Sequence, residues 1–177
     1  MSRSQQGLAG AGEWETLRKL LPDFKDKRVL DLGCGYGWHC IYAMEHGASS
    51  VVGVDISHKM LEVAKEKTHF PQVEYKCCAI EDVEFPEESF DVILSSLAFH
   101  YVADYEILVK KIYRILKSGG KLVFTVEHPV FTAYGTQDWH YNEKGKILHF
   151  PVDNYYYEGK RTAVFLGEKV TKYHRTL

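Results

Sequence analysis

The sequence predicts an α/β fold, a doubly wound, mostly parallel sheet with flanking helices. Three observations carry this prediction. Short apolar segments alternate with amphipathic segments of helical period between residues 27 and 127. A turn containing Gly33, Gly35 and Gly37 joins the first strand to a helix. The second strand ends on an acid, Asp55. A strand, glycine turn, helix and strand of this kind hold a nucleoside-containing ligand at the edge of a parallel sheet.

The individual elements follow from periodicity and from residues that begin or end helices. The apolar run 90–95 is typical of a strand buried on both faces. Pro22 ends one helix, Ser57 is a typical N-cap, and 118–120 (Ser-Gly-Gly) ends another helix. The predicted strands are 28–32, 50–54, 73–77, 90–95 and 121–126. The predicted helices are 13–21, 36–45, 57–67 and 105–116.

The composition of the chain changes after residue 127, where aromatic residues become frequent. We expect an aromatic-rich β insertion there, with antiparallel strands at 146–150 and 163–166, and a helix beginning at Thr176. With 177 residues the chain is expected to be one domain. Its predicted parts are a mobile arm over 1–12, a ligand-binding core over 27–127 and a β segment over 128–177.

Composition and charge exclude several classes of partner. The chain is 45% hydrophobic with a net charge of −2. Because this charge is small and negative, we expect no overall electrostatic attraction to nucleic acid or to an anionic membrane. No apolar run approaches the roughly 20 residues of a membrane span, and the start lacks a signal core, so we expect a cytoplasmic protein. Four cysteines without a Cys-x-x-Cys pair and nine scattered histidines predict no metal site.

Two residues near the glycine turn argue against a dinucleotide. Asp55 is placed to accept hydrogen bonds from two ribose hydroxyls, as in many nucleoside sites. However, Trp38 occupies the position that the dinucleotide fingerprint reserves for a small residue. Asp31, just before the turn, would repel a pyrophosphate and suit a cationic or hydrogen-donating ligand. An NAD-dependent oxidoreductase is therefore a lesser alternative.

Five ordered sequence blocks resemble a known family. They are 29–37 (Val-Leu-Asp-Leu-Gly-Cys-Gly-Tyr-Gly), 54–61, 79–82, 89–102 and 114–122. Together they look like the class I S-adenosylmethionine-dependent methyltransferases, most similar to the small-molecule branch that includes ubiquinone and menaquinone biosynthesis enzymes. The one small departure is Ser118, where the family commonly has proline. The resemblance implies a Rossmann-like fold and S-adenosylmethionine as cofactor.

The resemblance also implies roles for individual residues. The three glycines would lie beneath the methionine and ribose portion, and Asp55 would bind the ribose hydroxyls. The adenine would lie against Ile56 and Met60, unless these are simply core residues. The resemblance further implies Ile80 through its backbone, Glu81 or Asp82 at the adenine amino group, and Ser95 and Leu97 at the methionine end; Asp31 joins this set through its own position before the turn.

Methyl transfer by in-line displacement requires alignment more than a fixed set of catalytic groups. A general base is needed only where the acceptor must lose a proton. His100 and His128, which follow the fourth and fifth strands, are the candidate bases, although His100 could equally cap or pack in its loop. The Asn-Pro-Pro-Tyr pattern of enzymes that methylate DNA or protein amides is absent after strand four.

The aromatic segment 131–157 is expected to build the pocket for a small-molecule acceptor, aromatic or cationic, or else to be the core of a hairpin. No basic stripe accompanies it, so single-stranded nucleic acid is not the expected partner.

The chain ends before the two strands that usually complete the sheet of this class, so we expect it to be C-terminally truncated. An unprotected fifth strand predicts a homo-oligomer through the sheet edge. A catalytically impaired, cofactor-binding remnant or interaction module is the remaining alternative.

Overall fold

The computed structural model describes residues 7–134, 137–165 and 167–177. The chain divides into two compact units. The first, the sheet unit, contains the residues up to Phe99 and Asp104–Thr125. The second, the hairpin unit, contains His100–Ala103 and Val126–Leu177. The sequence placed the corresponding boundary after residue 127 and did not separate 100–103 from the core.

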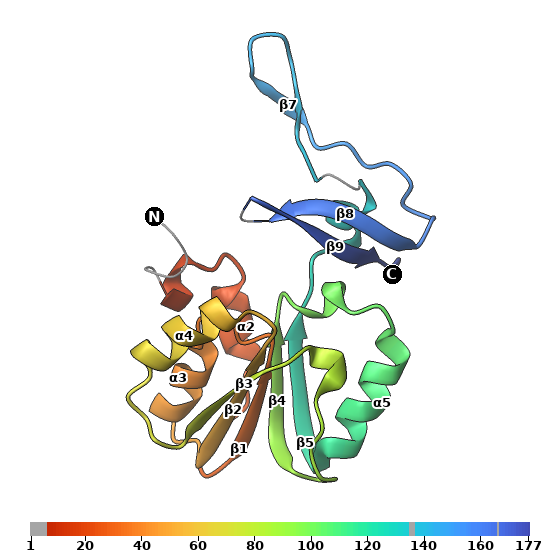
Figure 1. Ribbon diagram of the computed structural model, residues 1–177. Coiled ribbons are helices and arrows are strands. Elements are labelled where there is room, and N and C mark those ends of the chain that lie inside the picture. Colours follow the sequence, from red (N-terminus) through yellow and green to blue (C-terminus); the bar gives the residue numbers. More distant parts are fainter. Residues whose placement is uncertain (1–6, 135–136, 166) are drawn as a thin grey trace. The chain divides into compact units, whose positions relative to one another are not determined.

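The sheet unit contains five parallel strands in the order β3-β2-β1-β4-β5 (Figure 1). The strands are β1 (Arg28–Leu32), β2 (Ser50–Asp55), β3 (Val73–Cys77), β4 (Phe90–Ser96) and β5 (Leu116–Thr125). The strand order reverses between β1 and β4, and ligands of open α/β sheets bind at this switch point, outside the carboxyl ends of the strands. The predicted doubly wound, mostly parallel fold is confirmed.

Helices cover both faces of the sheet. Figure 1 shows α2, α3 and α4 on one side of the strands and α5 on the other. Their bounds are α2 (Trp14–Leu20), α3 (Trp38–Glu45), α4 (His58–Lys67) and α5 (Tyr105–Ile115). The described residues also form three 3-10 turns, η1 (Gly7–Gly10), η2 (Ile80–Asp82) and η3 (Phe99–Tyr101). Ser57 caps α4 as predicted, because its Oγ accepts the Met60 amide at 3.4 Å.

The core of the sheet unit lies on the central strands. Val29, Leu30 and Leu32 of β1 and Ile93 of β4 have no exposed surface. A parallel strand covered by helices on both faces needs apolar side chains at successive positions, and the sequences of β1 and β4 meet this requirement. This rigid centre positions the turns at the carboxyl ends of the strands.

Several predicted boundaries in this unit are wrong. The helix predicted over 105–116 ends at Ile115, and β5 begins directly at Leu116 instead of residue 121. Residues 118–120 form an irregularity within β5, since the pairing with β4 shifts between Phe90 and Val92 and Gly119 has a φ of 74°. In the predicted mobile arm, residues 1–6 lie outside the described residues, whereas Gly7–Gly10 forms η1.

The helix predicted over 36–45 begins at Trp38. Gly37 has a φ of 75°, and this left-handed conformation cannot continue a right-handed helix. The positive φ therefore separates the glycine turn from α3.

The hairpin unit has one short helix and two antiparallel hairpins. Its elements are α6 (Pro129–Ala133), β6 (His140–Tyr141), β7 (Ile147–His149), β8 (Gly159–Phe165) and β9 (Glu168–His174). The strand predicted over 163–166 covers only the end of β8, and β9 was not predicted at all. The helix expected from Thr176 is not formed in residues 175–177; the Thr176 amide and hydroxyl both donate to Glu158 Oε1 at 2.7 Å.

Two features of the described residues concern partners. β5 lies at one edge of the five-stranded sheet, and self-association through that edge stays a prediction. No helix within the described ranges has the length and apolar character that crossing a membrane requires.

We predict that Leu30→Ala, at the centre of β1, lowers the free energy of unfolding by about 2–5 kcal/mol, because it leaves a cavity among fully buried side chains. The control is Ile107→Ala on α5, where the side chain is 60% exposed and the loss should stay below about 0.5 kcal/mol. Urea denaturation measures both. Equal losses in the two variants would contradict the assignment of this core.

Candidate functional site

The glycine loop, residues 33–37, is attached to the end of β2 by backbone hydrogen bonds. The amides of Gly33 and Cys34 both donate to the carbonyl oxygen of Val54, at 2.8 and 2.9 Å. The amide of Gly35 donates to Asp55 Oδ2 at 2.8 Å. The loop after β1 and the acid after β2, which sequence analysis singled out separately, therefore form one structure.

The three glycines of this loop serve different purposes. All three have positive φ, of 80°, 53° and 75° for Gly33, Gly35 and Gly37. A Cβ on Gly33 would overlap the Ala98 side chain, and one on Gly37 would overlap the Tyr75 hydroxyl, so packing excludes larger residues at both. A Cβ on Gly35 would meet only Met60 Sδ, at 3.9 Å. The protein thus leaves space beside the middle glycine, where a ligand can approach the backbone.

Asp55 uses both carboxylate oxygens within the protein and keeps capacity for a ligand. Oδ2 accepts the Gly35 amide and Oδ1 accepts the Ser57 amide, each at 2.8 Å. Because a carboxylate has about four acceptor positions, two further hydrogen bonds remain available. Two ribose hydroxyls would fit that capacity, and the role of Asp55 as their acceptor stays a prediction.

Asp31 is buried with an unsatisfied oxygen. Its Oδ2 accepts a hydrogen bond from Cys40 Sγ at 3.4 Å, whereas Oδ1 has no partner among the described residues. Burial raises the pKa of this carboxyl, and the nearby His39 and the Cys40 hydrogen bond oppose the rise. A ligand ammonium or N–H group would satisfy Oδ1, which agrees with the predicted cationic or hydrogen-donating ligand.

The residues expected at the adenine differ in exposure. Ile56, next to Asp55, is 75% exposed, so the alternative that it is a core residue is wrong. Met60 and Ile80 are half-buried beside the glycine loop. Met60 Sδ lies 3.9 Å from the position a Cβ would take on Gly35, and Ile80 Cδ1 lies 3.5 Å from the corresponding position on Gly33. An exposed apolar side chain beside two half-buried ones is suited to cover a flat ring.

The remaining predicted cofactor residues lie in η2 and at the end of β4. Glu81 and Asp82 are both exposed, and the structure does not choose between them. The Ser95 hydroxyl is buried and donates to the Leu32 carbonyl oxygen at 2.8 Å, so it joins β4 to β1. Leu97 has a φ of 52°, held by its amide bonding to the Thr125 carbonyl oxygen at 2.9 Å. Strained non-glycine residues of this kind cluster at functional sites.

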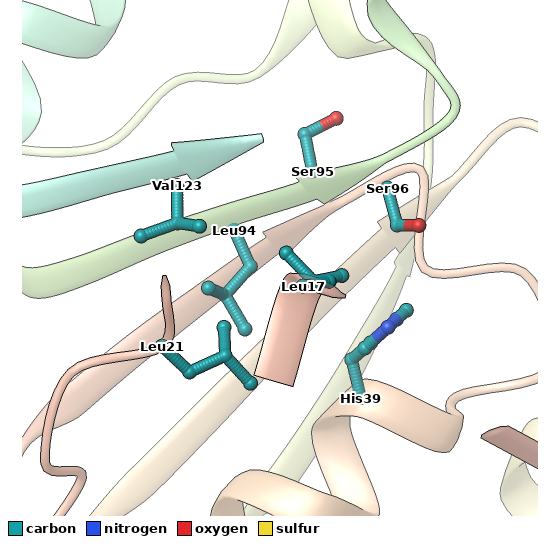
Figure 2. A pocket seen from close by; sticks show the side chains of 7 residues that line it. All are labelled: Leu17, Leu21, His39, Leu94, Ser95, Ser96 and Val123. Atoms are coloured by element: carbon teal, nitrogen blue, oxygen red, sulfur yellow. The ribbon is translucent and has the colours of Figure 1, made fainter. Parts of the chain in front are cut away.

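A narrow crevice, too small to hold a water molecule, lies beneath α2. Figure 2 shows Leu17 and Leu21 over Leu94 and Val123 of the sheet, with Ser95 and Ser96 on opposite faces of β4. None of the loop glycines lines this crevice. We therefore attribute it to imperfect packing of α2 on the sheet.

In the hairpin unit, His100 is buried without a hydrogen-bond partner. The residue is 5% exposed, and neither ring nitrogen has a hydrogen-bond partner within the described ranges. Its Nε2 lies 3.9 Å from Glu127 Oε1. Burial lowers the pKa of His100 to about 4; Glu127 opposes the decrease and Lys172 adds to it. The ring is therefore neutral at physiological pH.

Glu127 belongs to a network that sequence analysis missed. Lys172 Nζ donates to Glu127 Oε1 at 2.6 Å and to Gln137 Oε1 at 2.8 Å, and Gln137 Nε2 donates to Glu127 Oε2 at 2.8 Å. Lys172 is 3% exposed. The available signal was the alternation of Val170, Lys172 and His174 along β9, which places a lysine on the inward face of a strand.

His128, the second candidate base, has a structural role. Its Nδ1 accepts the Val130 amide at 3.1 Å and caps α6. In the neutral tautomer compatible with this bond, Nε2 carries the hydrogen and cannot accept a proton. The geometry therefore favours His100 over His128 as a proton acceptor.

Comparison with known proteins agrees with this geometry. A family model described as a methyltransferase domain matches residues 30–124, more than half of the chain. An S-adenosylmethionine-dependent methyltransferase from Mesorhizobium loti superposes with a TM-score of 0.86 at 41% identity, covering 97% of this chain and 78% of that one. A Listeria monocytogenes protein assigned to the same class gives a TM-score of 0.87 at 57% identity, with coverages of 94% and 78%.

Among curated proteins, a ubiquinone biosynthesis O-methyltransferase of Coxiella burnetii is 36% identical over 112 residues. That match covers 62% of this chain, and the chain spans 47% of that relative's length. The resemblance stated from the sequence blocks is confirmed: the chain belongs to the methyltransferase domain family, and its cofactor is S-adenosylmethionine.

Proposed function

We propose that this protein transfers the methyl group of S-adenosylmethionine to a small-molecule acceptor. The observation that carries the proposal is the arrangement at the glycine loop. There a buried carboxylate with an unsatisfied oxygen, an open glycine and a carboxylate with spare acceptor capacity lie on connected turns.

Each part of the cofactor has a group that suits it. Asp31 would receive the amino group of the methionine portion, Gly35 allows close approach of the backbone, and Asp55 would accept the ribose hydroxyls. Ile56 and Met60 would cover the adenine. When bound, S-adenosylmethionine supplies a methyl group activated by a positively charged sulfur. The protein then has to align the acceptor and exclude water.

His100 supports an acceptor that loses a proton. It lies four residues beyond the end of β4, and ligands of this fold bind beyond the carboxyl ends of the strands. A neutral imidazole with an unused lone pair can accept a hydrogen bond and then a proton. The similarity to a ubiquinone biosynthesis O-methyltransferase supports oxygen as the accepting atom.

Aromatic residues of the hairpin unit support an aromatic acceptor. Phe131 stacks on Phe150 with centroids 5.0 Å apart, and Trp139 meets Phe150 edge-on at 5.2 Å. Phe150 contacts the other two rings, but Phe131 and Trp139 are 39% and 46% exposed, so the three rings do not form the buried hairpin core that was the other alternative. Tyr156 and Tyr157 are 86% and 73% exposed and remain available to stack on a flat molecule.

We predict that S-adenosylhomocysteine binds to this chain with one site, measured by isothermal titration calorimetry. With S-adenosylmethionine present, the protein should then methylate a member of a panel of phenols, catechols and amines. Mass spectrometry detects the methylated product. NADH is the control ligand and should produce no saturable heat. Absence of S-adenosylhomocysteine binding at millimolar concentration would refute the proposal, and binding without turnover on a broad panel would favour a cofactor-binding remnant.

We predict that Ile56→Ala weakens S-adenosylhomocysteine binding roughly three- to tenfold, because part of the apolar cover of the adenine is lost. Its stability should change by less than about 0.5 kcal/mol, since Ile56 is 75% exposed. The control is Val164→Ala on β8, 67% exposed, which should leave binding unchanged. Calorimetry and urea denaturation provide the two readouts, and unchanged affinity in Ile56→Ala would remove Ile56 from the site.

We predict that His100 makes stability depend on pH. Its pKa is about 4 in the folded protein and about 6.5 when unfolded, so the unfolded chain binds the proton first as the pH falls. The contribution of the neutral His100 ring to the free energy of unfolding is complete above pH 6.5. It is lost as the pH falls towards 4, by at most about 1.4 kcal/mol per pH unit. Urea denaturation across this range measures it. His100→Gln is the control, and an equally steep loss in that variant would contradict the prediction.

A further inference from the structure

The carboxylate of Glu127 lies near two basic side chains, Lys172 and His100, and is hydrogen-bonded only to Lys172 of these two. Its Oε1 lies 2.6 Å from Lys172 Nζ and 3.9 Å from His100 Nε2. Its Oε2 accepts the Gln137 amide at 2.8 Å. Both oxygens are therefore directed at Lys172 and Gln137, and the histidine is left outside hydrogen-bond distance.

Gln137 completes a closed ring of hydrogen bonds with this ion pair. Its Oε1 accepts from Lys172 and its Nε2 donates to Glu127, so each of the three side chains contacts the other two. The backbone of Gln137 has a φ of 59°, an uncommon conformation for a residue other than glycine. A closed ring of this kind resists rotation of the Glu127 carboxylate toward another partner.

The ring of hydrogen bonds matters because His100 is close enough to respond to it. The titratable and charged groups facing His100 are Glu127 after β5, Lys172 on β9 and Tyr101 beside it in η3. Burial raises the pKa of Tyr101 to about 12, so this phenol stays neutral. Burial, which favours the neutral ring, and the opposing effects of Glu127 and Lys172 therefore determine whether the imidazole carries a charge.

We propose that Lys172 and Gln137 are positioning residues that hold Glu127 away from His100, so that the imidazole stays neutral and can take a proton from the acceptor. The inference rests on the proposed function and narrows its substrate class. The acceptor group must carry a hydrogen that it donates to the ring, as a hydroxyl does and a tertiary amine does not. Glu127 remains 3.9 Å away to stabilise the imidazolium once the proton has moved.

The direct test is the titration of His100 in the full chain without cofactor, followed by NMR of the imidazole ring, with His100→Gln assigning the signal. In the parent protein the midpoint should lie well below the ordinary value of 6.5. In Lys172→Met the Glu127 carboxylate loses its lysine partner and should raise the His100 midpoint by about one to three pH units. Lys172→Arg should restore a low midpoint.

Lys169→Met is the matched control, because Lys169 is an exposed lysine on the same strand and should not affect the titration. If Lys172→Met does not fold, Gln137→Met, which releases only Oε2, should raise the midpoint in the same direction. A parent midpoint at or above 6.5, or an unchanged or lower midpoint in a folded variant, would overturn the inference.

Failure of this inference is distinguishable from failure of the proposed function. If S-adenosylhomocysteine binds and methyl transfer proceeds while the midpoint does not move, only the role of Lys172 and Gln137 is refuted. If the midpoint moves but the cofactor does not bind, the methyltransferase proposal fails and the positioning network stands. With both intact, the pH profile of kcat in Lys172→Met should shift upward with the His100 midpoint.

Discussion

The carboxylate of Asp55 is the interaction on which the cofactor side of this molecule depends. It binds the amide of Gly35 in the loop after β1 and the amide of Ser57 at the start of α4. Two neighbouring parallel strands therefore end in turns that share one anionic group. Because both bonds are made by backbone amides, the geometry of the loop does not depend on flexible side chains, and the carboxylate is preorganised for a ligand.

Unsatisfied buried polar groups identify both candidate sites. Asp31 Oδ1 in the sheet unit and the two ring nitrogens of His100 in the hairpin unit lack partners among the described residues. Leaving such groups unpaired costs about 1–3 kcal/mol each, so they call for an explanation by function. A ligand amino group explains the first, and a proton-bearing acceptor explains the second.

The two sites obtain their chemistry by different physical means. At the glycine loop, backbone conformation dominates: positive φ at three glycines creates a turn in which Gly35 alone leaves room beside it. In the hairpin unit, electrostatics dominates, because a buried lysine and a glutamine hold one carboxylate close to a neutral imidazole without a hydrogen bond to it. The first kind of site leaves a readable sequence motif, whereas the second depends on contacts between distant residues.

This difference between a local motif and long-range contacts explains which features could be predicted from the sequence. Strand character, the glycine turn and Asp55 are local patterns, so the sequence alone determined the sheet, the family and the cofactor. The bulge at 118–120, the strand β9 and the Glu127–Gln137–Lys172 network required the tertiary structure. Lys172 lies 45 positions from Glu127 in the chain, and the charged residues Glu168, Lys169 and Lys172 itself concealed its strand. Only folding places that lysine in the interior, because pairing with β8 directs alternate side chains of β9 inward.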